Sequence, residues 1–387
     1  MSQPQTPGNT KVVTPSNIGK ILEKWLRKID EPGRVFTKNK KIEIVFLIEA
    51  VNAILSRTEG VEDITLVKIP GTDYEVPAIL PEKPQAVARR NMLSYLRDYY
   101  SRNRNEVRGY LEKLSKVFVP IEDESKKEKK KKEKQPVGYV KAGEYLEKGE
   151  WNCYIQPPSG EGTDEGMDGF CPACALFGSL LDKTKISVDT DISVGLKSRV
   201  EFDPAFAISD RKVSVVPLTH IKVGDGLSWT GQSLFREFHV VPGTVFVGKV
   251  TLEDVTEPEL TAFLATLATI SRLGGRERIF GGVRIHIVGI KGGSYETVSA
   301  LELAKKLVKK YAERLPDVEE VIRELKQELS NRGFITEVDQ EEVKKLVDSD
   351  STWRNLWIST LEYSKQVLER VLQLLGIRDK YQLVWKE

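Results

Sequence analysis

The pattern of apolar and polar positions divides the chain into a strand-rich first part and a helical last part. Residues 41–55, KIEIVFLIEAVNAIL, form a nearly continuous apolar run that predicts a buried strand, although its length would also suit a helix. Residues 187–250 contain several alternating stretches, such as RKVSVVPLTHIKV, which predict further strands, and residues 283–290 alternate in the same way. Residues 258–273 lie between these strands and predict a helix.

After residue 290 the apolar spacing becomes helical. Residues 297–315, 318–329 and 341–375 are amphipathic, with Leu361 and Leu368 on one stripe of the last segment. Strands followed by a run of helices predict the α+β class: an α+β core with a helical region at its end.

Proline and arginine mark the region after the first strand. Residues 67–84 are rich in proline, which predicts an extended loop. Residues 86–118 predict a basic helix whose first arginines are Arg89 and Arg90. The N-terminal residues 1–17 predict a flexible tail, and residues 18–29 a short amphipathic helix.

Composition narrows the class of protein. The chain has 387 residues and a net charge of +2, so a nucleic-acid surface would have to be a local basic patch. Three cysteines argue against a secreted disulfide framework, and we expect a cytoplasmic protein without a membrane span. Residues 122–138 are lysine-rich and interleaved with acids, and they contain no apolar residue before Val137. They predict a disordered loop.

The three cysteines are the main candidate for site chemistry. Cys171 and Cys174 form a C-x-x-C pair that follows a glycine-rich and acidic loop rather than a strand, which favours a metal site over a redox pair. Cys153 is a plausible third ligand, and structural zinc takes four ligands in a closed site. Three unligated thiols remain an alternative.

A histidine would be the natural fourth ligand, and the chain has three histidines. His220 lies at a predicted strand-to-loop junction and is the first choice, with His239 second. His286 alternates within a predicted strand and reads as a core or surface residue. The predicted structural zinc site is therefore Cys153, Cys171, Cys174 and His220.

Several segments, in order, resemble a known family. The signature C-x-x-C-x-L-F-G-S in residues 171–179 resembles the backbone subunits of CRISPR effector complexes of the RAMP superfamily. The segments THIKVGDGLSWTGQSLFREFHVVPGTVFVGKV and LGGRERIFGGVRIHIV are similar to the family's protruding hairpin and to its glycine-rich loop. The helical C-terminus and the lysine-rich loop resemble the type I-D backbone subunit of Cascade, which belongs to the seventh Cas family.

The resemblance implies an RRM-like (ferredoxin-like) core with peripheral insertions. The core would comprise residues 18–120 and 180–290, including the basic helix and the hairpin (thumb or lid). The zinc-binding insertion would be 139–179 and the helical domain 291–387, with the tail at 1–17 and the disordered loop at 121–138.

The resemblance also implies a role in antiviral defence as a backbone subunit that binds single-stranded guide RNA (crRNA) without reading its sequence. Such a subunit would self-associate along the RNA and contact other CRISPR effector subunits. Phosphate binding calls for cations, glycine loops and stacking aromatic residues. The residues that supply them are Lys83, Arg89, Arg90, Lys222, Trp229, Arg236, Gly274, Gly275, Arg276 and Arg278.

Two other functions remain open from the sequence. In some members of the resembled family a loop aspartate cleaves target RNA, and Asp63 is the candidate for that role here. A lone loop carboxylate is a weak signal for catalysis, and a non-catalytic scaffold is therefore the leading expectation. The second is a zinc-stabilised protein-interaction module without a nucleic-acid role, suggested by the amphipathic C-terminus.

Overall fold

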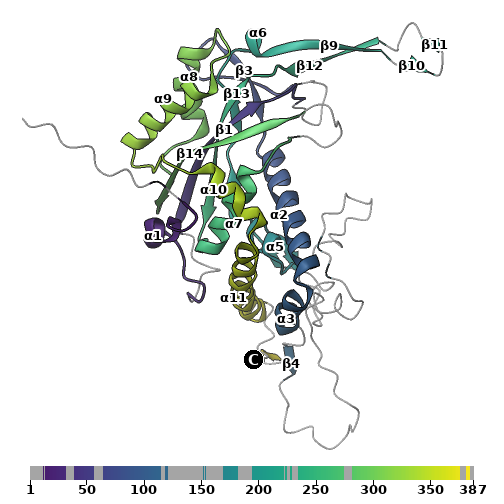
Figure 1. The fold of residues 1–387 in the computed structure, drawn as a ribbon, viewed down its shortest axis with the longest axis vertical. Helices are drawn as coiled ribbons and strands as arrows, with labels where there is room; N and C mark the ends of the chain where they lie inside the picture. The colour runs from purple at the N-terminus through teal and green to yellow at the C-terminus, as the bar shows by residue number, and fades with distance from the viewer. Residues whose placement is uncertain are drawn as a thin grey trace, which may run out of the picture.

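Figure 1 shows the computed structural model of the chain, with an antiparallel sheet at its centre and helices on both sides. The structure describes residues 12, 14–31, 39–55, 64–114, 118–120, 151, 153, 169–181, 194–221, 223–224, 227–228, 234–273, 281–374 and 381–383. The fold is mixed α+β, as the apolar pattern predicted.

The central sheet has seven strands among the described residues. Their order is β14-β1-β13-β8-β3-β2, with β7 also paired to β13, and these strands pair antiparallel throughout. Its strands are β1 (Lys41–Ala50), β2 (Leu66–Lys68), β3 (Glu75–Ile79), β7 (Val200–Phe202), β8 (Ala205–Ala207), β13 (Val245–Glu253) and β14 (Val283–Gly293). The segment that could have been strand or helix is therefore strand β1, an interior strand that pairs with β14 and β13.

In the part of the chain that the structure describes, four strand pairs lie outside the central sheet. The longest joins β9 (Val215–Ile221) to β12 (Leu234–Val240), and this ribbon projects from the core at the top of Figure 1. The others pair β4 (Phe118–Pro120) with β15 (Tyr381–Leu383), β5 (Ser179–Leu181) with β6 (Val194–Leu196), and β10 (Val223–Gly224) with β11 (Leu227–Ser228).

The helices are α1 (Ile18–Leu22), α2 (Glu82–Arg102), α3 (Arg104–Leu114), α5 (Pro172–Phe177), α6 (Arg211–Ser214), α7 (Glu257–Ala268), α8 (Ala300–Tyr311), α9 (Val318–Asn331), α10 (Gln340–Lys345) and α11 (Asp350–Leu374). Two 3₁₀ turns, η1 (Glu23–Trp25) and η4 (Leu346–Asp348), extend α1 and α10. Helices α2 and α7 contact each other, and α11 packs on α7.

The register of β1 shows that helices cover both of its faces. Phe46 lies opposite Gly248 and packs against Phe202, whose ring contacts Phe263 of α7. The adjacent Val45 points to the other face and lies opposite Gly289, where a Cβ would meet Leu329 of α9. Because successive strand residues alternate between faces, a strand covered on both sides reads as a continuous apolar run.

Four local expectations were wrong in their bounds. Helix α2 begins at Glu82, inside the predicted loop, because proline is compatible with the first turn of a helix and Pro84 sits there. The predicted helix 86–118 is broken at Asn103 into α2 and α3. The predicted helix 341–375 is divided into α10, η4 and α11, and the predicted N-terminal helix is only five residues long.

A buried arginine joins three parts of the fold. Arg199, 4% exposed, lies with Nη2 2.7 Å from Oε1 of Glu259, which is 0% exposed. Its Nε donates to the carbonyl oxygen of Ala175 at 3.1 Å, and its guanidinium lies 4.3 Å from the ring centre of Tyr363. Arg199 therefore connects the cysteine-bearing segment, the start of α7 and helix α11.

We expect Glu259→Gln to lower the free energy of unfolding by about 3–5 kcal/mol, because it leaves a buried guanidinium without its counter-charge. Glu259 also accepts from the backbone N–H of Thr256 in a capping box, so the same change weakens the start of α7. Urea unfolding followed by circular dichroism measures the effect.

The matched control is Arg211→Gln, which breaks an exposed pair with Glu75 and should cost less than about 1 kcal/mol. Equal losses for Glu259→Gln and Arg211→Gln would contradict the role given to the buried pair.

Candidate functional site

The three cysteines come together in one buried cluster. Their sulfur atoms all lie within 4.8 Å of one another, and each cysteine is 0% exposed. Cys171 is the N-cap residue of α5, Pro172 begins the helix, and Cys174 follows in its first turn. The i, i+3 spacing places Cys171 and Cys174 on one side of this short helix, and Cys153 comes from a separate segment.

The cluster has the dimensions of a tetrahedral zinc site. A zinc–sulfur bond of about 2.3 Å implies sulfur atoms about 3.8 Å apart along a tetrahedron edge. The sulfur atoms of Cys153 and Cys174 lie 3.7 Å apart, and none of the three cysteines forms a disulfide. The donor set and its spacing therefore fit a metal ion held by thiolates.

The surroundings of Cys174 favour its thiolate. Hydrogen bonds from Cys153 and Cys171 hold the pKa of the Cys174 thiol well below its usual range, and the nearby positive charge of Arg89 lowers it further. Nη2 of Arg89 lies 3.7 Å from Sγ of Cys174. Since metals bind thiolates, a lowered pKa assists metal binding at neutral pH.

The histidines do not complete the cluster within the described part of the chain. His239, 0% exposed in β12, and His286 are both outside the group of sulfur atoms. His286 lies in β14 with Nε2 2.9 Å from Glu49, in keeping with the structural role predicted for it. The side chain of His220 is outside the described residues. His220 as a ligand therefore stays a prediction, although its strand β9 lies well away from α5 in Figure 1.

Helix α2 carries three of the predicted RNA-binding cations, and they differ in exposure and in the groups that they contact. Arg90 is exposed and makes no ion pair among the described residues. Lys83 is half-buried in the first turn, and burial lowers its pKa to about 8. Arg89 instead turns inward and donates from Nη2 to the carbonyl oxygen of Gly178 at 2.9 Å. The adjacent arginines therefore face different surroundings.

The remaining predicted residues are mostly beyond the described residues. Of the hairpin set, Arg236 has a described backbone, which pairs with Thr219 in the β9/β12 ribbon. Those that lie outside are Asp63, Lys222, Trp229, Gly274, Gly275, Arg276 and Arg278. The second glycine pair of the same loop, Gly281 and Gly282, is described.

The close packing of Gly281 and Gly282 gives this end of the loop a structural reason for glycine. Gly281 has φ +80°, and a Cβ there would lie 2.4 Å from the carbonyl oxygen of Leu273. A Cβ on Gly282 would lie 2.6 Å from Oδ1 of Asn52, which accepts from the Gly282 N–H.

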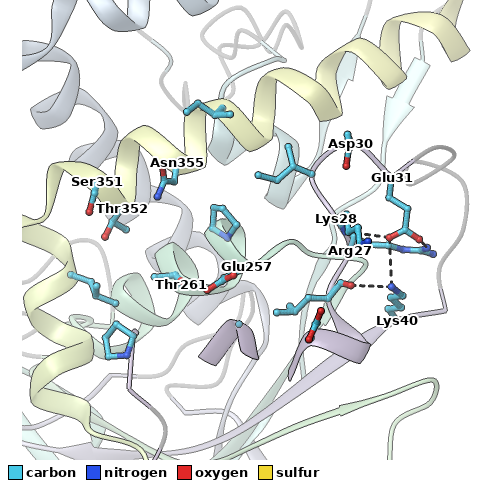
Figure 2. A pocket seen from close by; sticks show the side chains of 18 of the residues that line it. Arg27, Lys28, Asp30, Glu31, Lys40, Glu257, Thr261, Ser351, Thr352 and Asn355 are labelled. Carbon is cyan, nitrogen blue, oxygen red and sulfur yellow. Dashed lines mark hydrogen bonds and ion pairs between the residues drawn. The ribbon is translucent and has the colours of Figure 1, made fainter. Parts of the chain in front are cut away.

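Figure 2 shows a cavity of about 1310 Å³ that no motif predicted. It lies between the N-terminal segment, the start of α7 and the first turns of α11. Its lining carries four cations, Lys24, Arg27, Lys28 and Lys40, and four carboxylates, Glu23, Asp30, Glu31 and Glu257. Two of the cations are paired: Arg27 with Glu31 and with Asp254 at 3.1 Å, and Lys40 with Glu31 at 3.6 Å. A lining with balanced charges offers little net attraction to a phosphate, so this cavity is a poor candidate for the RNA groove.

The sequence contained no signal for this cavity, because its walls come from segments that meet only through folding. Among the described residues, no helix combines the length and apolarity that a membrane span requires.

Comparisons with known proteins agree with the motif reading. The family described as Csc2 Crispr matches residues 24–375. The crystal structure of Thermofilum pendens Csc2 is similar, with 35% sequence identity and a TM-score of 0.67, covering 92% of this chain and 96% of that chain. No curated protein sequence matches the chain.

Two further structures are more distant. A chain of a type IV-B CRISPR complex has 14% identity and a TM-score of 0.33, covering 63% of this chain and 90% of that chain. A chain of a CRISPR RNA-guided surveillance complex has 9% identity and a TM-score of 0.39, covering 75% and 83%. Likenesses of this size add nothing to the assignment. The match across residues 24–375, together with the similar Csc2 structure, shows that the chain belongs to the Csc2 family of CRISPR proteins, the type I-D backbone family that its segments resemble.

Proposed function

We propose that the chain is a non-catalytic backbone subunit of a type I-D CRISPR interference complex in the cytoplasm, and that it binds single-stranded guide RNA without reading its sequence. In this proposal, copies of the chain associate along the RNA and contact other effector subunits. Membership of the Csc2 family supports the setting. The observation that carries RNA binding is Arg90, which is exposed, makes no ion pair with the described residues, and lies near the start of a long helix that also presents Lys83.

The strand order supports an RRM-like core. In the run β14-β1-β13-β8, the strands are the fourth, first, third and second of a β-α-β-β-α-β unit, with α2 and α7 as its two helices. The cysteine segment enters between α2 and β7, and the β9/β12 ribbon between β8 and β13. Both would then be insertions into one small core, as the resemblance implied.

The covering of the sheet indicates where RNA would bind. Side chains on both faces of β1 and β13 are buried beneath α7 on one side and α8 and α9 on the other. A strand of RNA therefore cannot lie across these two strands and would contact loops, helix ends and the projecting ribbon. Contacts of that kind hold phosphates and sugars, which suits a protein that must accept any guide sequence.

We also propose that the cysteine cluster holds one structural zinc ion. Cys153, Cys171 and Cys174 would bind it, and their complete burial suits a closed site that stabilises the fold. The fourth ligand would come from His220 or from another group outside the described residues. The target-cleaving alternative depends on Asp63, which the structure does not describe, and we therefore keep the scaffold function.

Arg90→Ala should weaken binding to every single-stranded RNA about fivefold at low salt and reduce the slope of log affinity against log salt by about 0.7, the value for one phosphate contact. Fluorescence anisotropy with two unrelated RNA sequences measures both quantities. Arg323→Ala, an exposed arginine on α9, is the matched control and should change neither.

An unchanged affinity in Arg90→Ala would remove this part of α2 from the RNA surface. If wild-type protein bound no single-stranded RNA at all, the protein-interaction alternative would be favoured instead.

The pKa of Lys83 predicts how RNA binding depends on pH. A lysine whose pKa is lowered from 10.5 to about 8 loses its proton as the pH rises through 8, and with it a contact to phosphate. We expect RNA affinity to fall between pH 7 and pH 9, and Lys83→Arg to remove this fall because arginine stays charged. Anisotropy at constant ionic strength measures it, and an identical pH profile for Lys83→Arg would exclude a Lys83 contact.

Purified protein should contain about one zinc ion per chain by elemental analysis. Cys153→Ser, Cys171→Ser and Cys174→Ser should each lose most of it and unfold at lower temperature, because a structural zinc site contributes directly to stability. His286→Asn is the control and should retain the metal. His220→Ala decides the fourth ligand: retention of zinc would exclude His220. Full zinc content in Cys171→Ser would overturn the site itself.

A further inference from the structure

The side chain of Arg89 belongs to the cysteine cluster rather than to the RNA surface. Its Nη2 lies 3.7 Å from Sγ of Cys174 and 2.9 Å from the carbonyl oxygen of Gly178, the residue that ends α5. One guanidinium group thus contacts a proposed metal ligand and the end of the helix that carries it.

Charge explains why a cation would be placed there. Three thiolates and one divalent zinc ion leave one net negative charge, and the three cysteines are fully buried. A buried charge is unfavourable unless an opposite charge or hydrogen-bond donors compensate it. Arginine suits this task because its guanidinium stays protonated and directs several N–H donors from one plane.

Gly178 makes the position of the guanidinium specific. It has φ +82°, and a Cβ there would lie 2.5 Å from the carbonyl oxygen of Leu196. The backbone at Gly178 therefore lies close against the end of β6. This packing fixes the position of the Gly178 carbonyl oxygen, to which Arg89 donates. A second arginine of α2, Arg97, donates to the carbonyl oxygen of Cys153, so α2 contacts both segments of the cluster.

We propose that Arg89 is a positioning residue of the metal centre, where it compensates the charge of the three thiolates and fixes Cys174 for metal binding. This inference rests on the proposed zinc site and is independent of the RNA proposal. It assigns the neighbouring arginines of α2 to different tasks: Arg89 to the cluster and Arg90 to the solvent face.

The test compares Arg89→Gln with Arg89→Lys in the full-length protein. Glutamine keeps a donor for Gly178 but loses the charge, and lysine keeps the charge. Competition with a chromophoric chelator gives zinc affinity, and Co²⁺ substitution reports thiolate coordination through its visible and charge-transfer absorption. We expect Arg89→Gln to bind zinc about 10- to 100-fold more weakly, as when a group that orients metal ligands is lost. Its half-loading should also shift to higher pH, and Arg89→Lys should restore most of both.

Arg90→Gln is the matched control, one residue along the same helix, and should leave zinc affinity and the Co²⁺ spectrum unchanged. Zinc affinity of Arg89→Gln within twofold of wild type, or equal losses in Arg89→Gln and Arg89→Lys, would overturn the proposal. Failure of both variants to fold with zinc would overturn it as well, since charge would then not be what the site requires.

RNA binding at saturating zinc separates this proposal from the proposed function. Arg89→Gln should bind single-stranded RNA like wild type, while Arg90→Gln should bind it more weakly. Normal zinc affinity with weakened RNA binding in Arg89→Gln would return Arg89 to the RNA surface and end the present proposal. Unchanged RNA binding in Arg90→Gln would count against the RNA surface and leave the role of Arg89 intact.

Discussion

One buried ion pair connects three separate parts of the fold. The guanidinium of Arg199 bonds the carboxylate of Glu259 while also donating to the backbone carbonyls of Ala175 and Asp254 and contacting the ring of Tyr363. Burial by itself would lower the pKa of Arg199, but the negative charge of the paired Glu259 carboxylate and the hydrogen bonds to it outweigh burial and keep that pKa above its ordinary value. A charge in this place requires all of these partners, because a buried guanidinium is costly when any of them is missing. The cysteine segment, α7 and α11 must therefore all lie where they can contact the side chain of Arg199.

The covered sheet explains why the cysteine cluster and α2 matter for function. Because helices cover both faces of β1 and β13, the side chains of these strands form the core of the protein. Residues that bind a partner or ligand must therefore lie in the segments around the sheet. Peripheral segments lack a large apolar core of their own and need other means of fixing their position. The three cysteines provide one such means, and the contacts from α2 to Gly178 and Cys153 provide another. A helix that helps to hold the cluster also presents its other side to solvent.

The spacing of apolar residues predicted which strands and helices form better than it predicted where they begin and end. The apolar run of β1 was correctly assigned as a buried strand, and the helical periodicity after residue 290 was confirmed in α8, α9 and α11. The prediction for residues 82–84 was wrong because of proline. Pro84 was taken as part of a loop, but proline is accepted in the first turn of a helix, and α2 begins at Glu82 with Pro84 in that turn. The long C-terminal prediction was divided because α10 and η4 pack against α7 separately from α11, a tertiary contact that periodicity does not contain.

The sequence by itself determined the α+β class, the pairing of Cys171 with Cys174, and the family, because these depend on residue spacing and on motifs that are contiguous in the chain. Only the tertiary structure decided that Cys153 joins the pair within 4.8 Å, and that Arg89 faces the cluster while Arg90 faces solvent. Neighbouring arginines on a helix are alike in sequence and differ by about 100° in direction. Which of them is buried depends on what packs against the helix, and the segment that packs on Arg89 includes Gly178, 89 residues further along the chain.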